Sequence, residues 1–258
     1  DLNGDGEIGT IAANKFQGAV FDGNNDGIRT ATGWVSPEDG LLVRDINSDG
    51  LINSGAELFG DSTKLANGTN AKNGFAALSD LDSNGDGKVD SNDTNFNELK
   101  VWKDINGDGV SQASELFSLN DVGIQSLNVN INEIKNEQVE GGYLAETGSY
   151  TKADGSLGKM ADVNFENQDI YSKFTSQVEV TQDVSVLPQL KGYGRLKDLH
   201  QVAMQSTEFK NLLSQYVNAT TRSEQKELLD SLVKSWAKSD PAYSNDPIEI
   251  IRMINVEW

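Results

Sequence analysis

The sequence has no cysteine and a single histidine, His200. Without cysteine, neither disulfides nor thiolate metal sites can hold the fold together. One histidine also argues against a histidine-ligated zinc site, and against a Ser-His-Asp triad in the first 190 residues. No run of about 18 apolar residues occurs, so we expect no membrane span.

Basic residues are scarce, with 21 lysines and arginines against 40 aspartates and glutamates and a net charge of −19. Such a polyanion repels nucleic acid and anionic lipid, so we expect no nucleic-acid partner. The stretch from Lys191 to Trp258 holds nine basic and nine acidic residues. The acidic excess therefore lies in residues 1–190, where it predicts sites for cations.

Residues 82–115 carry two loops of the form Asp-x-Asn-x-Asp-Gly whose first residues are 22 positions apart. In an EF-hand loop, Ca²⁺ takes oxygens from positions 1, 3, 5, 7 and 12, and glycine at position 6 permits the sharp turn. Both loops end on an acid at position 12, Asp93 or Glu115. The alternative, a pair of exposed Asx turns, is disfavoured by two complete copies so close together.

Three more loops begin in the same way but end differently. Position 12 is Ala12 in one and Gly33 in the next, so both lack a closing acid, whereas the third has Glu57 one residue late. Carboxylates from elsewhere could complete them, with Asp39 and Asp61 as candidates beside Glu57; solvated turns are the alternative. We number the five loops L1 to L5, beginning at Asp1, Asp22, Asp45, Asp82 and Asp104.

The predicted calcium ligands are the loop residues at positions 1, 3, 5 and 7, where position 7 acts through its carbonyl, together with the closing acids. We expect three to five Ca²⁺ ions, with the strongest binding at L4 and L5. The predicted ligand residues are Asp1, Asn3, Asp5 and Glu7 in L1; Asp22, Asn24, Asp26 and Ile28 in L2; Asp45, Asn47, Asp49, Leu51 and Glu57 in L3; Asp82, Asn84, Asp86, Lys88 and Asp93 in L4; and Asp104, Asn106, Asp108, Val110 and Glu115 in L5.

The expected fold class is α+β, with EF-hand-like calcium loops, short helices and small antiparallel strands, followed by a small α-helical domain. Phe75, Leu78 and Leu81 have helical spacing and predict a helix before L4. We expect one helix over residues 94–103, shared by L4 and L5, and another after L5 that ends near Gly123.

Downstream of L5, we expect a strand from Ile124 to Ile131 and a polar loop over residues 132–142. Tyr143–Lys152 and Leu157–Phe165, joined across Ala-Asp-Gly-Ser, predict a β-hairpin.

The predicted domains are a calcium-binding module over residues 1–175, a connector over 176–190 and a helical domain over 191–258. In the last of these, apolar residues recur at helical spacing and indicate core-facing stripes. Thr221 followed by Glu224 predicts a capping box at the start of one helix. Ile250, Ile251 and Ile254 predict a short final helix.

Residues 1–175 resemble the self-processing module of FrpC-type RTX proteins of Gram-negative bacteria. Residues 176–258 resemble the helical segment that often follows this module. The stretches that carry the resemblance are DLNGDGEIGT, FDGNNDGIRTATGWVSPEDGLLVRDINSDG, GAELFGD, LDSNGDGKVD and LKVWKDINGDGVSQASEL.

The resemblance implies a secreted or cell-surface protein whose calcium-induced folding triggers cleavage of an Asp–Pro bond just before the module. That reaction is a single turnover in cis, through a cyclic anhydride that water opens or that a lysine of another protein opens to form an isopeptide crosslink. The cleaved bond would lie upstream of Asp1, so no residue here is named as the nucleophile. The Asp240–Pro241 and Asp246–Pro247 pairs are typical of helix starts.

Two alternatives remain open from the sequence alone. The chain could be a non-catalytic structural calcium-binding module of a large bacterial adhesin, in which ions only stiffen the protein. A dockerin-like module that binds a partner would need only two such loops, and five loops at tight spacing count against it.

Overall fold

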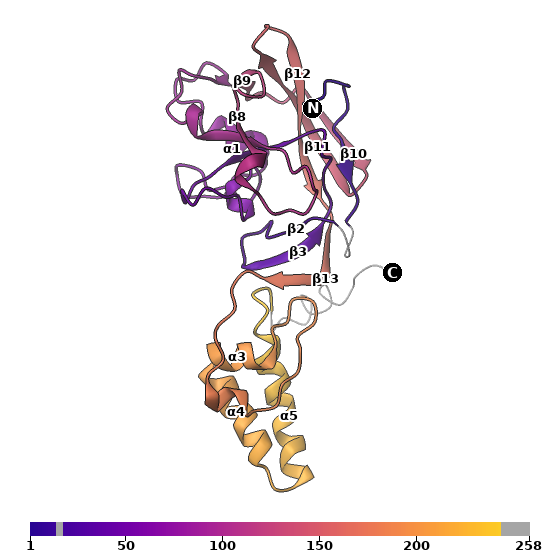
Figure 1. Ribbon diagram of the computed structural model, residues 1–258, viewed down its shortest axis with the longest axis vertical. Coiled ribbons are helices and arrows are strands. Elements are labelled where there is room, and N and C mark those ends of the chain that lie inside the picture. Colours follow the sequence, from indigo (N-terminus) through magenta and orange to yellow (C-terminus); the bar gives the residue numbers. More distant parts are fainter. Residues whose placement is uncertain (14–17, 244–258) are drawn as a thin grey trace. The chain divides into compact units, whose positions relative to one another are not determined.

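The computed structural model describes residues 1–13 and 18–243, and Figure 1 shows its helices and strands. The chain divides into two compact units, Asp1–Gln168 and Asp169–Trp258. Strands β1 to β12 and one short α-helix lie in the first unit, and helices α2 to α5 lie in the second. Strand β13 (Asn167–Phe174) runs across the boundary. No described helix is both long and apolar enough to cross a bilayer.

The largest sheet of the first unit is built around β11 (Gly142–Lys152), its longest strand. On one edge, β11 pairs with β12 (Leu157–Phe165); on the other it pairs with β10 (Glu133–Val139) and β9 (Ile124–Asn128). Strand β6 (Lys88–Val89) extends the sheet beyond β9. All these pairs are antiparallel.

The other strands of this unit form small antiparallel groups. One group orders as β5–β7–β8; β2 and β3 form a hairpin, and β1 pairs with β4. Their bounds are β1 Thr10–Ile11, β2 Val20–Phe21, β3 Ile28–Thr32, β4 Trp34–Val35, β5 Leu41–Arg44, β7 Leu99–Trp102 and β8 Leu116–Ser118.

An aromatic cluster forms one of the two hydrophobic cores of the first unit. The rings of Phe21, Trp34 and Trp102 lie 5.2 to 5.9 Å apart between centroids, and all three side chains are fully buried. Each such side chain contributes about 1.5–3 kcal/mol or more through burial. The second core gathers Val89 and Leu99 with other residues of the β6, β7 and β9 strands.

The predicted helix before L4 is confirmed as α1 (Gly74–Ser79), with Phe75 and Leu78 buried. The helix predicted over residues 94–103 is wrong, because that segment forms a 3₁₀ turn, Phe96–Glu98, and then strand β7. Strand β7 lies between two other strands, and this pairing satisfies its backbone on both edges.

The helix predicted after L5 is also wrong. The chain there forms a 3₁₀ turn, Ala113–Glu115, then β8 and further turns as far as Gly123. L5 therefore lies between a strand and a 3₁₀ turn, without the helix on each side that an EF-hand has.

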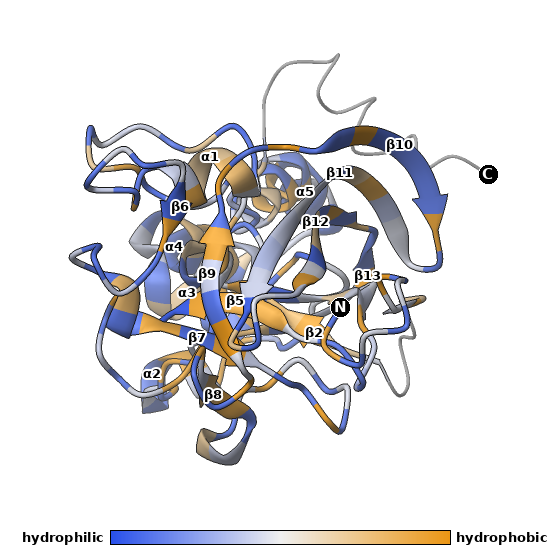
Figure 2. Ribbon diagram, turned by 90° about the horizontal axis from the view of Figure 1, so that it is seen from above, coloured by the Kyte–Doolittle hydropathy of each residue, from blue (hydrophilic) through white to orange (hydrophobic). Residues whose placement is uncertain are grey.

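The predicted hairpin is confirmed, since β11 and β12 pair over most of their length. The polar loop predicted over residues 132–142 is wrong, because most of it is strand β10. This strand is largely hydrophilic and lies at the edge of its sheet (Figure 2). Its sequence has no apolar face that would predict a strand. Its pairing with β11 determines its conformation.

The second unit is a small helical domain made of α2 (Gln182–Ser185), α3 (Leu199–Gln205), α4 (Thr207–Asn218) and α5 (Arg222–Ala237). Its core includes Phe209, Leu213 and Val184, which are almost fully buried.

Residues 176–190, predicted to be a connector, contribute α2 and its buried Val184 to this core. That segment therefore belongs to the helical unit. The short final helix predicted at residues 250–254 lies outside the described residues.

The predicted capping box at the start of α5 is confirmed. The Thr221 hydroxyl accepts the Glu224 N–H at 3.3 Å, and the Glu224 carboxylate accepts the Thr221 N–H at 3.1 Å. These two bonds satisfy donors that would otherwise lack partners in the first turn.

Replacing the capping hydroxyl tests this contribution. Thr221→Ala should lower the free energy of unfolding of the helical unit by about 1 kcal/mol, because one N–H of the first turn loses its acceptor. Urea denaturation followed by far-UV circular dichroism measures the change. Ser223→Ala, an exposed substitution in the same turn, should change it by less than about 0.5 kcal/mol. Equal effects of the two substitutions would contradict the assignment.

Candidate metal centres

All five loops have the same backbone turn. The glycine at position 6 has φ between 71° and 89°, and position 4 also has positive φ, between 56° and 77°. Only glycine adopts this region freely, while asparagine tolerates it better than most residues. The residues at position 6 are Gly6, Gly27, Gly50, Gly87 and Gly109; those at position 4 are Gly4, Asn25, Ser48, Gly85 and Gly107.

Two hydrogen bonds recur in every loop and direct the carboxylates inward. The aspartate at position 1 accepts the N–H of position 6 at 2.8 to 3.2 Å. The aspartate at position 5 accepts the N–H of position 7, also at 2.8 to 3.2 Å. In L3, the N–H of Leu51 lowers the pKa of Asp49 in this way. The turn therefore holds the carboxylates at positions 1 and 5, two of the predicted ligands of each loop, against one tight stretch of backbone.

In four of the five loops, a further carboxylate closes the loop by accepting a backbone N–H. In each of L1, L3, L4 and L5, the N–H of position 9 donates to an acid at 2.7 to 3.2 Å. The bonds run from Gly9 to Asp39, from Asn53 to Glu57, from Asp90 to Asp93, and from Gln112 to Glu115.

Asp39 supplies to L1 the acid that its own sequence lacks. The Oδ1 of Asp39 accepts the N–H of Leu2 at 2.8 Å, and in L4 the Oδ1 of Asp93 accepts the N–H of Ser83 at the same distance. Leu2 and Ser83 both occupy position 2 of their loops, so the two acids are equivalent. Asp39 is 2% exposed. Of the three candidates named from the sequence, it is the one that reaches L1.

In L3, the closing acid Glu57 approaches Asp45 and Asp49. All three offer carboxylate oxygens that lie within 4.8 Å of one another. Glu57 is buried, and its Oε1 atom has no hydrogen-bond partner. Burial, together with Asp49 and Asp45, raises the pKa of Glu57. A buried carboxylate oxygen beside two more acids fits a hard divalent cation such as Ca²⁺.

L5 is joined directly to the aromatic core. The indole Nε1–H of Trp34 donates to Asp104 at 2.8 Å, and that of Trp102 donates to Glu115 at 3.3 Å. Asp104 and Glu115 are both buried. No spacing rule in the sequence links Trp34 to a loop 70 residues away, so this contact could not be predicted.

L2 differs from the others because it connects β2 to β3 as a hairpin loop. Its ninth residue, Thr30, pairs with Phe21 across this hairpin. Asp22, at position 1, is buried, and this burial raises its pKa against the lowering effect of its backbone hydrogen bonds. L2 thus has the turn of the other loops without the same closure.

L3 and L5 are coupled through their eighth residues. The Ile52 N–H donates to the Ser111 hydroxyl at 2.7 Å, and that hydroxyl donates to the Ile52 carbonyl at 3.1 Å. The sequence predicted a different link, one helix over residues 94–103 shared by L4 and L5. Instead, β6, which follows the turn of L4, pairs with β9.

Residues 1–166 match the family described as the SPM domain. The chain is 50% identical over 240 residues to the "Iron-regulated protein FrpA" of Neisseria meningitidis serogroup C. That alignment covers 93% of this chain and 21% of FrpA, so the chain spans about a fifth of the relative's length. These matches confirm the resemblance to FrpC-type proteins in part, because they show that the chain is related to FrpA. The chain belongs to the SPM domain family.

Proposed function

We propose that the first unit is a calcium-folded module that promotes cleavage of an Asp–Pro bond just upstream of Asp1, in a protein secreted or held at the bacterial surface. The observation that carries the proposal is the closing carboxylate common to L1, L3, L4 and L5. The chain that carries these carboxylates belongs to the SPM domain family.

The reaction needs no nucleophile from this chain. The side-chain carboxylate of the upstream aspartate attacks its own backbone carbonyl, the C–N bond to proline breaks, and the proline nitrogen takes up a proton. The product is a cyclic anhydride. Breaking the C–N bond has already separated the two fragments. Water then opens the anhydride to a C-terminal aspartate with two carboxyl groups, or a lysine amine of another protein opens it to give an isopeptide bond and one free carboxyl group.

The contribution of the fold is to orient the start of the chain. The Asp1 carboxylate accepts the Gly4 N–H at 2.7 Å, the Asp1 carbonyl accepts the Tyr150 hydroxyl at 2.6 Å, and Leu2 is bound to Asp39. These contacts fix the backbone next to the proposed bond once L1 is folded. Fixing reacting groups in an attack geometry lowers the barrier by removing rotational freedom.

Calcium supplies the free energy that offsets repulsion among the loop carboxylates. A site whose Kd is a hundredfold below ambient calcium adds ~2.7 kcal/mol of stability, so three to five sites add roughly 8–13 kcal/mol. A whole domain is stable by only about 5–15 kcal/mol. Calcium can therefore decide whether the first unit folds.

The first prediction from the proposed function concerns removal of calcium. With EGTA, the first unit should lose most of its structure, while the helices of the second unit persist. The indole N–H signals of Trp34 and Trp102 report on L5 by NMR, because both donate to its carboxylates. Both signals should move to the chemical shifts of an unfolded chain, and the strand signal in circular dichroism should be lost at the same time. Unchanged indole signals after EGTA would reject calcium-dependent folding.

The second prediction concerns Asp39. Asp39→Asn should lower the free energy of unfolding by about 1.5–3 kcal/mol, because the charged acceptor of two part-buried N–H bonds is replaced by an amide with one acceptor oxygen. Chemical denaturation at saturating calcium measures the change. Glu38→Gln removes the same charge from an exposed neighbour and should change stability little. If both variants behaved alike, net charge rather than closure of L1 would be the cause.

The third prediction tests cleavage directly. The chain, extended upstream through the residues that precede Asp1 in its parent protein, should split into two fragments on a denaturing gel when calcium is added. Asp108→Ala in L5 should raise the calcium level needed by about tenfold or more. The control Asp230→Ala, at an exposed position of α5, should leave it unchanged. A folded, calcium-loaded chain that stays intact would favour a purely structural module.

A further inference from the structure

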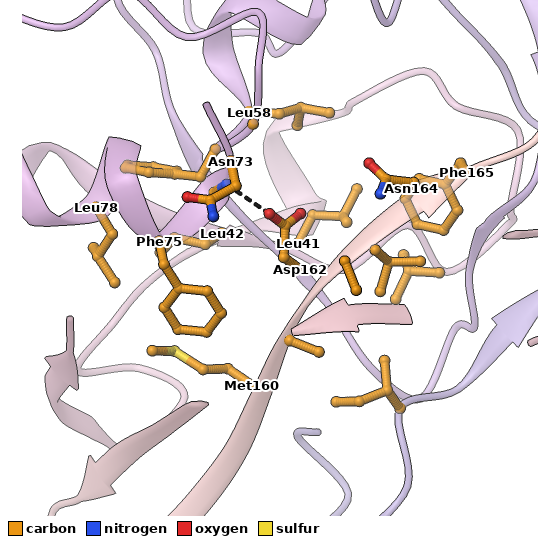
Figure 3. A pocket seen from close by; sticks show the side chains of 18 of the residues that line it. Leu41, Leu42, Leu58, Asn73, Phe75, Leu78, Met160, Asp162, Asn164 and Phe165 are labelled. Carbon is orange, nitrogen blue, oxygen red and sulfur yellow. Dashed lines mark hydrogen bonds between the residues drawn. The ribbon is translucent and has the colours of Figure 1, made fainter. Parts of the chain in front are cut away.

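A cavity of about 810 Å³ lies in the first unit, between α1 and the β11–β12 hairpin (Figure 3). Its volume is in the range of sites that take small ligands. Much of its wall is apolar, with Leu58, Phe75 and Met160 among the lining side chains. Asp1 and Asp39 of L1 line one part of the cavity, and Asp162, Glu146 and Asp61, which belong to none of the five loops, line another.

One part of the polar wall of the cavity carries three acidic residues. Asp162 is half-buried there, and its Oδ2 accepts the Gly74 N–H at 2.7 Å. The Glu146 carboxylate accepts the Asn73 amide at 3.1 and 3.0 Å, and Asp61 lines the same space. Figure 3 shows the Asp162 carboxylate reaching from β12 toward the start of α1.

These carboxylates have no cationic partner among the described residues, since none of the three takes part in an ion pair there. Burial, and after it Glu146 and Asp61, raises the pKa of Asp162. A cation placed between these groups would relieve both effects. Lys159 and Lys72 also line the cavity, and the Lys159 ammonium donates instead to the Gly6 carbonyl.

The arrangement does not suit a divalent metal. Asp162 and Glu146 lie opposite each other on the extended strands β12 and β11, and not in a loop that wraps around an ion. Ca²⁺ needs six to eight oxygens around one point. An ammonium group needs only three acceptors, and a lysine joins it to a flexible stem of four methylenes.

We propose that this cavity binds the side chain of a lysine from a partner protein, with its methylenes against Phe75 and Met160 and its ammonium at Asp162 and Glu146. The inference rests on the proposed function, in which a lysine opens the anhydride. Asp1 and Leu2 line the same cavity, so a lysine bound there lies in the space that the start of the module reaches.

The chemical step balances. The bound ammonium gives one proton to the Asp162 carboxylate or to water. The neutral nitrogen attacks the side-chain carbonyl of the anhydride, a C–N bond forms, and the ring C–O bond breaks. The backbone carboxylate leaves, and the nitrogen loses its second proton to water.

Binding is tested by NMR titration of the full chain at saturating calcium with Nα-acetyl-lysine methylamide. The Gly74 amide signal reports on Asp162, its acceptor. We expect saturable shifts of this signal, and at least tenfold weaker binding of Nα-acetyl-norleucine methylamide, which has a methyl group in place of the ammonium. Equal binding of the two probes, or no saturation, would overturn the proposal.

Variants distinguish binding of the lysine probe in the cavity from non-specific attraction of the probe to an acidic protein. Asp162→Asn and Glu146→Gln should each weaken binding of the lysine probe about tenfold. Asp154→Asn removes an equal charge from the exposed turn between β11 and β12 and should leave binding unchanged. The calcium-bound indole signal of Trp34 shows that each variant is folded. Equal weakening by all three substitutions would indicate non-specific attraction and overturn the proposal.

The experiments distinguish the absence of a lysine site in the cavity from the absence of the proposed cleavage reaction. In the upstream-extended chain with a lysine peptide, Asp162→Asn should lower the ratio of crosslinked to hydrolysed product relative to Asp154→Asn. Cleavage without any binding of the lysine probe would refute the lysine site alone. Specific binding of the probe by a chain that never cleaves would refute the proposed reaction and leave the site standing.

Discussion

Carboxylates that accept backbone N–H bonds organise the first unit. In each loop, the aspartates at positions 1 and 5 hold the turn, and in four loops a further acid fastens position 9. A carboxylate so used concentrates negative charge where the chain turns most tightly. The same bonds that shape the loop therefore create the demand for a cation. Stability and the proposed ion binding thus depend on one set of atoms.

The sequence was informative where structure is local. Alternating Asp, Asn and Gly identified all five turns, and the Ala-Asp-Gly-Ser turn identified the β11–β12 hairpin. It was misleading where pairing partners are distant. Leu99 and Trp102 have spacing compatible with a helix, yet β5 and β8 on either side make their segment a strand. Nothing local in the polar β10 indicates its partner β11.

Long-range closure was only partly predictable. Glu57 is close in sequence to the loop that it closes, and spacing was enough to suggest it. Asp39 accepts an N–H 37 residues away, and the sequence could only place it among several free acids. The contact of Trp34 with Asp104 requires the aromatic cluster to be assembled first. Such contacts follow from tertiary packing and carry no periodic signal.

The exchange of hydrogen bonds between Ile52 and Ser111 has a thermodynamic consequence. Because the eighth residues of L3 and L5 share this bridge, ordering one loop removes part of the entropy cost of ordering the other. If both loops hold ions, as proposed, their occupancies are linked, and by reciprocity each favours the other to the same degree. A shared serine hydroxyl would thus sharpen a graded response to ion concentration into a cooperative one.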